Sequence, residues 1–200
     1  MMAPVNETQR AEARRQQVLD AAAQCFRDRG FHGASMAEIA RTAGMSPGHI
    51  YNLFENKEEL IAAIVARDQA LWLAKAEAML RGPDVAQAML DGVCCGVDDC
   101  TALPDAALRL EVAAEAGRNP KLAATVQAAD VASRERCEAL LRAALTQRGL
   151  EVEATVLRAR ASVLAALFDG LMVRSVRDPA MDKPQLVAEI RRMVQALIER

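Results

Sequence analysis

The sequence predicts an all-α protein of about nine helices, with a small N-terminal helix-turn-helix domain and a larger C-terminal helical domain. Hydrophobic residues make up 52% of the 200 residues but aromatic residues only 3%, which is typical of helical proteins rich in Ala, Leu and Val. Apolar residues recur at helical spacing along most of the chain, without a strand pattern or an internal repeat. Capping and turn signals near residue 45 place two short helices side by side.

The segment 35–57 carries the signals of two short helices joined by a tight turn. Ser35 and Glu38 form a capping box, which predicts a helix that begins directly after Ser35. Gly44 ends that helix, because it tolerates the left-handed conformation that such a sharp turn needs. Ser46 then caps a second helix. Two helices in this arrangement predict a helix-turn-helix.

The outer face of the second helix carries short or planar hydrogen-bonding groups, where a solvated helix would carry Lys and Glu. Such a face suits the DNA major groove, and Gly48 allows a close approach to the DNA backbone. Lys57, at the start of the next helix, opposes the helix dipole, and a phosphate contact would explain it. The alternative is a plain helical hairpin with a polar outer face. The expected DNA contacts are Ser35, Ser46, Pro47, Gly48, His49, Tyr51, Asn52 and Lys57.

This part of the chain resembles the DNA-binding domain of the TetR/AcrR family of bacterial transcriptional regulators. The resemblance runs from about Arg14 to Ile64, and four motifs carry it in order: Gly-Phe at the end of the first helix, Ile-Ala followed by Ala-Gly, Tyr-x-x-Phe, and Asn-Lys-Glu. It implies a DNA-binding domain over residues 10–66 and a ligand-binding and dimerisation domain over residues 67–200. It also implies a phosphate contact for Lys57 and a four-helix bundle formed by the last two helices of two subunits.

The other helices are expected to end at Gly, Pro and Asn signals. A polar, disordered segment covers residues 1–9, and the first helix covers about residues 10–29, where Gly30 ends it. The fourth helix covers about residues 57–80 and crosses the domain boundary, so it would act as a rigid lever. The later helices are expected at 84–97, 105–118, 120–148, 151–177 and 183–199, with a loop at 98–104.

Met and aromatic side chains of the C-terminal domain suit an adaptable apolar cavity, although an ordinary core is the alternative for each residue taken singly. Glu111 and Glu115 lie one turn apart, and a buried carboxylate pair would select a cationic ligand. Solvation, or a bridge to Arg109 or Arg118, is the more usual arrangement. The residues expected to bind a ligand are Trp72, Met79, Met89, Val93, Leu110, Glu111, Phe168 and Met172.

The last two predicted helices have apolar residues on more than one side. A second apolar face indicates a subunit interface, and a helix-turn-helix protein usually reads two half-sites as a dimer. A fully internal helix in a monomer is the alternative. The residues expected at the homodimer interface are Val163, Leu167, Gly170, Ile190 and Leu197.

Five cysteines, an odd number, do not form a disulfide framework. Cys94, Cys95 and Cys100 cluster at one helix end, so a thiol-based redox regulator is an alternative, although no nearby His or Cys-x-x-Cys spacing completes a metal site. Both histidines lie in the DNA-binding region, and no nucleophile is paired with a base. We therefore expect no catalytic residues, metal or cofactor, and a helical enzyme is a remote alternative.

The net charge of −2 excludes a protein that coats nucleic acid by general attraction, so DNA binding must be local and geometric. No apolar run approaches the length of a membrane span, and the N-terminus lacks the apolar core of a secretory signal, so we expect a cytoplasmic protein that does not bind membranes. The sequence thus predicts a dimeric transcriptional repressor, released from a palindromic operator in double-stranded DNA by a small, largely apolar effector.

Overall fold

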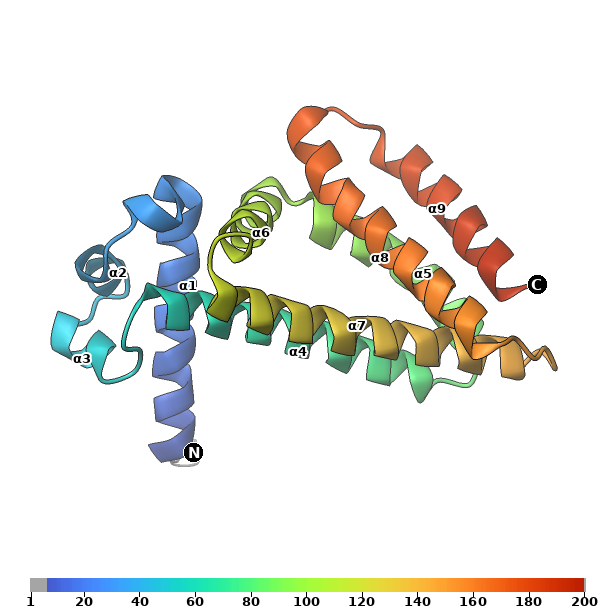
Figure 1. Ribbon diagram of the computed structural model, residues 1–200, viewed down its shortest axis with the longest axis horizontal. Helices are drawn as coiled ribbons and strands as arrows, with labels where there is room; N and C mark the ends of the chain where they lie inside the picture. Colours follow the sequence, from blue (N-terminus) through green and yellow to red (C-terminus); the bar gives the residue numbers. More distant parts are fainter. Residues whose placement is uncertain (1–6, 200) are drawn as a thin grey trace, which may run out of the picture.

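The computed structural model describes residues 7–199, and within them it contains nine α-helices and no strand, which confirms the predicted all-α class (Figure 1). Three helices form the smaller part at one end: α1 (Glu7–Gly33), α2 (Met36–Thr42) and α3 (Pro47–Tyr51). The long α4 (Lys57–Leu80) leads from them into the larger part. That part contains α5 (Val85–Thr101), α6 (Leu103–Ala116), α7 (Pro120–Thr146), α8 (Ala154–Arg177) and α9 (Lys183–Ile198).

The first helix is interrupted at Gly30, which has a φ of +73° that breaks the helical path. The prediction that regular helix ends there is right, but the chain forms one more turn as far as Gly33. The helix also begins at Glu7, so residues 7–9 are helical and not disordered as predicted. The rest of that predicted segment lies outside the described residues.

The helix-turn-helix forms through the predicted caps. The Ser35 Oγ atom accepts a hydrogen bond from the Glu38 amide at 3.2 Å, and Gly44 makes the turn with a φ of +65°. In a full capping box the Glu38 carboxylate would also accept a hydrogen bond from the Ser35 amide. Here it pairs instead with Arg29 at 2.7 Å and Arg41 at 3.3 Å. The carboxylate therefore links α2 to the end of α1.

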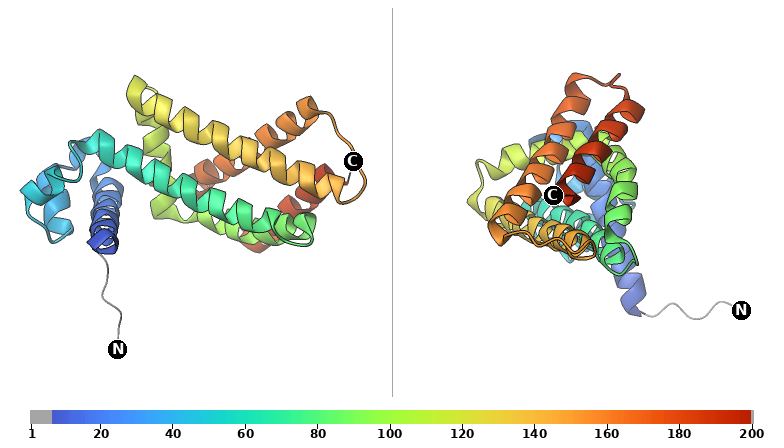
Figure 2. Two further views of the ribbon diagram at one scale, coloured as in Figure 1. Left: turned by 90° about the horizontal axis from the view of Figure 1, so that it is seen from below. Right: turned by 90° about the vertical axis from the view of Figure 1, so that its right-hand side faces the viewer.

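The larger part is built on α4 and α7, which lie side by side along their length (Figure 2). The α8 and α9 helices run in opposite directions at the far end, and α5 packs against both of them. None of the helices within residues 7–199 is long and apolar enough to cross a bilayer.

The predicted loop at 98–104 is wrong. The α5 helix continues to Thr101, and α6 begins after the single residue Ala102. Asp98 and Asp99 suggested a loop, but they are exposed on the last turn of α5, where a helix tolerates them. The connection between α5 and α6 is consequently a single residue long.

Buried side chains form two groups. The first joins α1, α2, α3 and α4, and it also includes Leu108 and Val112 of α6 and Leu122 of α7. The second joins α5, α7, α8 and α9 around residues such as Leu141, Leu164 and Ile190. The core under the helix-turn-helix is therefore completed by residues far along the chain.

Candidate nucleic-acid interface

The α3 helix has an inward apolar side and an outward polar side. Ile50 is fully buried, and Phe54, which follows the helix, is 1% exposed, so these two side chains fix α3 on the first core. Tyr51, by contrast, is 54% exposed, although a folded protein ordinarily covers most of an aromatic side chain. The predicted DNA contacts Ser46, Pro47, Gly48 and Asn52 are also exposed, and His49 is half-buried.

Three of the predicted contacts have local structural roles as well. Ser46 caps α3 by accepting a hydrogen bond from the His49 amide at 3.3 Å, as Ser35 caps α2. Pro47 occupies the first turn of α3, where its missing N–H costs nothing. A capping hydroxyl keeps its own O–H as a donor, so a role in DNA binding remains compatible with the cap.

Gly48 is not required by packing. A Cβ atom built at this position would meet no atom within 4 Å, and the backbone does not adopt a left-handed conformation. Gly44, four residues earlier, also has open space around it but needs its positive φ. The fold therefore explains Gly44 and leaves Gly48 to be explained by what approaches α3 from outside.

Lys57 lies half-buried at the base of the helix-turn-helix. Its Nζ atom donates to the carbonyl oxygens of Phe31 at 2.7 Å and Ala34 at 2.9 Å, and it lies 4.8 Å from the centre of the Phe31 ring. These carbonyls account for a cation at the start of α4, so a phosphate is not needed to explain it. The predicted phosphate contact stays a prediction.

Most of the residues expected around a ligand cavity pack into the second core. Met89 and Val93 are buried on α5, and Trp72, Met79 and Phe168 pack against the same core. A Cβ built at Gly92 would lie 2.6 Å from the Met79 methyl group, and one built at Gly96 would lie 2.9 Å from the Phe168 ring. These glycines make room for large side chains, which are packed closely in this structure. Leu110 and Met172 are half-buried.

Glu111 does not lie with the other expected ligand residues. Its carboxylate faces α1 and accepts a 2.5 Å hydrogen bond from the Phe31 amide, so its placement on a cavity wall needs correction. Glu115 is 7% exposed and pairs with His32 and Arg118, each at 3.1 Å. The pair of carboxylates is thus divided between two structural contacts, and the bridge to Arg118 is one of the alternatives that the sequence offered.

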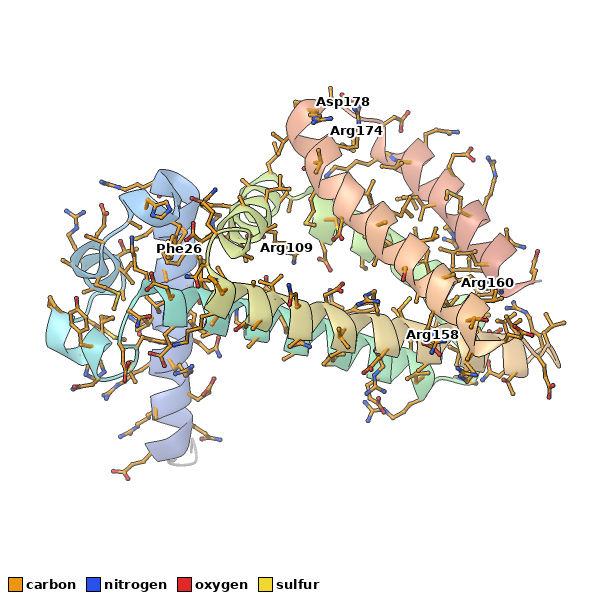
Figure 3. The ribbon with its side chains drawn as sticks, viewed as in Figure 1. Phe26, Arg109, Arg158, Arg160, Arg174 and Asp178 are labelled. Atoms are coloured by element: carbon orange, nitrogen blue, oxygen red, sulfur yellow. The ribbon has the colours of Figure 1, made fainter. Side chains whose placement is uncertain are left out.

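A group of charged residues that the sequence did not reveal lies on the other side of α6. Arg109 projects from α6 away from α1 (Figure 3), and its Nε atom lies 3.7 Å from Asp68 Oδ2 on α4. Partial burial raises the pKa of Asp169 on α8, and Asp130 on α7 raises it further, whereas Arg109 lowers it. Because these residues come from four helices, no sequence spacing could have indicated the group.

No disulfide bond joins two cysteines in the part of the chain that the structure describes. All five, which lie within residues 7–199, are free thiols. Burial raises the pKa of the Cys100 thiol, and it raises that of Cys137 to about 11, so these two are poorly reactive at neutral pH. Cys94 and Cys95 are exposed, and no group of metal-ligating side chains is found among the described residues. The thiol-based alternative is not favoured.

The α8 helix presents an exposed apolar surface. Val163 is 53% exposed, and Leu167 and Gly170 are half-buried beside it. Small or apolar side chains continue along this side of α8 at intervals of three and four: Val156, Ala159, Val163, Ala166, Gly170 and Val173. A solvent-exposed stripe of this length on one helix is typical of a subunit contact.

The residues expected at the interface on α9 need correction. Ile190 is 1% exposed and belongs to the second core. Leu197, two helical turns later on the same side, packs against that core. Met193 instead is 46% exposed. The apolar stripe that the sequence showed on α9 is therefore the inward side of this helix.

Comparisons with known proteins agree with this architecture. Residues 18–64 match the family described as "Bacterial regulatory proteins, tetR family", and residues 83–199 match "BetI-type transcriptional repressor, C-terminal". The regulator BetI of Escherichia coli O45:K1 is 31% identical over 178 residues, which are 86% of this chain and 87% of that protein. The regulator UidR of Escherichia coli K12 is 35% identical over 117 residues, so the match spans 58% of this chain and 59% of UidR.

Solved structures extend the likeness to the whole fold. GusR of Salmonella enterica superposes with a TM-score of 0.78 at 26% identity, covering 98% of this chain and 99% of GusR. FadR of Bacillus subtilis, solved in complex with stearoyl-CoA, superposes with a TM-score of 0.75 at 17% identity, covering 92% of this chain and 97% of FadR. The second likeness shows the fold alone.

Proposed function

Because this chain belongs to the TetR family of bacterial regulatory proteins, we propose that it represses transcription as a homodimer bound to a two-fold symmetric operator, and that a small molecule releases it. The proposal divides the chain into a DNA-binding domain over residues 10–66 and a ligand-binding and dimerisation domain over residues 67–200. Under this proposal the protein acts in the cytoplasm, where it meets DNA, and it is not an enzyme.

The observation that carries the proposal is the outward side of α3. A tyrosine that is 54% exposed, an asparagine and a glycine with open space beside it lie next to one another on a helix held by buried Ile50. Tyr51 and Asn52 offer the planar and hydroxyl groups that read base edges or bind phosphates. A helix whose outer side was only solvated would need none of these features.

The homodimer is proposed from the apolar stripe on α8. A single recognition helix of five residues reaches few base pairs, so specific binding needs two of them on neighbouring half-sites. The stripe around Val163 is exposed in the single chain, and α8, which carries it, lies in the larger part of the molecule, away from α3 (Figure 1). Pairing through it would leave both α3 helices free to contact DNA.

The effector is proposed to bind in the larger domain. Trp72, Phe168 and Met172 provide apolar surface there, and the stearoyl-CoA complex of FadR gives a precedent for an effector in this fold. Because Trp72 and Phe168 pack closely in this structure, binding would have to separate side chains of the second core. Arg109 and the carboxylates near it would supply the polar contacts.

The proposed function is tested by selecting DNA from a random-sequence duplex pool with the purified protein. The proposal predicts enrichment of a two-fold symmetric sequence, and it predicts that Tyr51→Ala reduces the enrichment. Leu71→Ala is the matched control, because Leu71 is 59% exposed on α4 and carries no proposed role. Failure of the wild-type protein to enrich any sequence would overturn the proposed function.

A further inference from the structure

The single residue Phe31 is held from two sides by two different helices. Its N–H donates to Glu111 Oε1 of α6 at 2.5 Å, and its carbonyl oxygen accepts from Lys57 Nζ of α4 at 2.7 Å. Phe31 itself is 2% exposed and packs against Phe26 of α1, with ring centres 5.6 Å apart. The end of α1 is thus fixed to both α4 and α6, two of the helices through which the larger domain contacts the DNA-binding domain.

The backbone at Gly30, where α1 is interrupted, leaves room for the Glu111 carboxylate. At Gly30 the φ of +73° interrupts α1, which turns the Phe31 N–H toward α6. A Cβ atom at Gly30 would lie 2.8 Å from Glu111 Oε1, so the carboxylate occupies space that only a glycine leaves open. A buried N–H without an acceptor is costly, so the bond to Glu111 is not easily replaced.

The α6 helix makes this contact as part of a continuous face. Leu108 and Val112 are buried in the first core, and Glu115, one turn beyond Glu111, pairs with His32 at 3.1 Å. At the start of the helix Asp105 pairs with Arg27 at 2.9 Å. Positions spaced by three and four residues thus join α6 to α1 along its length.

The opposite face of α6 belongs to the larger domain. Arg109 projects away from α1 (Figure 3) and lies beside Asp68 of α4, and its charge acts on Asp169 of α8. One helix therefore carries, on its two sides, contacts with other helices of the larger domain and contacts with α1.

We propose that α6 passes displacements of the larger domain directly to the DNA-binding domain through the Glu111–Phe31 hydrogen bond, in addition to the continuous α4 helix. Glu111 is the positioning residue of this route, and the state in which its bond is intact is the state that binds DNA. The two routes meet at Phe31, so a displacement of α6 relative to α4 by about 1 Å breaks one of the two hydrogen bonds. The inference rests on the proposed function, because it concerns the binding of an operator.

The test compares Glu111→Ala and Glu111→Gln with wild-type protein and with the control Glu135→Ala, whose side chain is exposed on α7. The probe is the duplex that the wild-type protein selects from a random pool. Two quantities are measured: the affinity for that duplex, and the hydrogen–deuterium exchange of peptides spanning residues 27–34 in free and DNA-bound protein.

We expect Glu111→Ala to speed exchange of the 27–34 peptides and to lower duplex affinity on the order of tenfold, with a smaller change for Glu111→Gln and none for Glu135→Ala. In wild-type protein, DNA should slow exchange of these peptides although Phe31 is buried and does not touch DNA. If the Glu111→Ala protein does not fold, the same comparison is made with Glu111→Gln, which keeps the side-chain shape.

The inference is overturned if the Glu111 variants bind the duplex as tightly as wild-type protein, or if DNA leaves exchange at 27–34 unchanged. Faster exchange with unchanged affinity would show a contact that is only structural. A wild-type protein that selects no duplex would instead overturn the proposed function, and the inference with it.

Discussion

The ammonium group of Lys57 lies 2.7 Å from the carbonyl oxygen of Phe31 and 2.9 Å from that of Ala34. A side chain that was expected to contact DNA therefore donates hydrogen bonds to the backbone of its own chain. Removing it leaves two carbonyl acceptors at the base of the helix-turn-helix without this partner. We expect Lys57→Ala to lower the free energy of unfolding by about 1–3 kcal/mol. Urea denaturation measures this loss.

Lys75 is the matched control for that experiment. It pairs with Asp99 at 2.5 Å, but both side chains are about half exposed, so Lys75→Ala should cost about 0–1 kcal/mol. Equal, small losses for the two variants would contradict the structural role of Lys57. An ammonium group has three donors, so a phosphate contact by the third remains a prediction, to be read from a reduced salt dependence of DNA binding in Lys57→Ala.

The contrast between two glycines gives a second prediction. Gly48→Ala meets open space at an ordinary helical position, so it should leave unfolding unchanged or stabilise the protein by about 0.5–1 kcal/mol. Gly44→Ala forces a side chain into a φ of +65° and should destabilise by about 1 kcal/mol or more. If DNA approaches α3 closely, Gly48→Ala should nevertheless bind the operator more weakly. A stable Gly48→Ala protein with full operator affinity would remove this glycine from the interface.

A third prediction concerns readout by α3. Tyr51→Ala and His49→Ala should each weaken operator binding by roughly 1–3 kcal/mol, the scale of a lost base or phosphate contact. Fluorescence anisotropy of a labelled duplex measures the change, and circular dichroism checks that the helices are intact. Wild-type affinity in both variants would place the DNA on another surface.

The fourth prediction concerns assembly. Val163→Arg places a charge in the apolar stripe of α8 and should convert the proposed dimer to a monomer in sedimentation. Val131→Arg on α7 is the control, because Val131 is similarly exposed at 45% but lies outside the stripe. Sedimentation of wild-type protein as a monomer at micromolar concentration would refute the dimer.

Local signals predicted the elements that depend on local chemistry. Asn56 caps α4 through the Glu59 amide at 2.8 Å, and the bounds of that helix agree with the prediction, Lys57 to Leu80. The caps and turn of the helix-turn-helix formed in the same way, because a cap joins residues three apart. The exposed side of α3 follows from buried Ile50 alone.

Contacts between distant residues could not be predicted. Glu111 and Phe31 are separated by 80 positions, and no pattern near Glu111 distinguishes a carboxylate that binds a backbone amide from one that lines a cavity. Similarly, the α9 sequence shows an apolar stripe through Ile190, but packing on α5 and α7 decides that this side faces inward. Lys57 shows the same limit, since its partners lie in the last turn of α1 and directly after that helix.

The most direct measurement of the central claim is a hydroxyl-radical footprint of the protein on the duplex that it selects. Two copies of α3 in adjacent major grooves predict two protected patches on one side of the DNA, related by two-fold symmetry and about one helical turn, or a multiple of it, apart. The account further predicts that Tyr51→Ala weakens both patches together. A single patch, continuous protection along the duplex, or an unchanged footprint with Tyr51→Ala would contradict a dimeric regulator that reads DNA through α3.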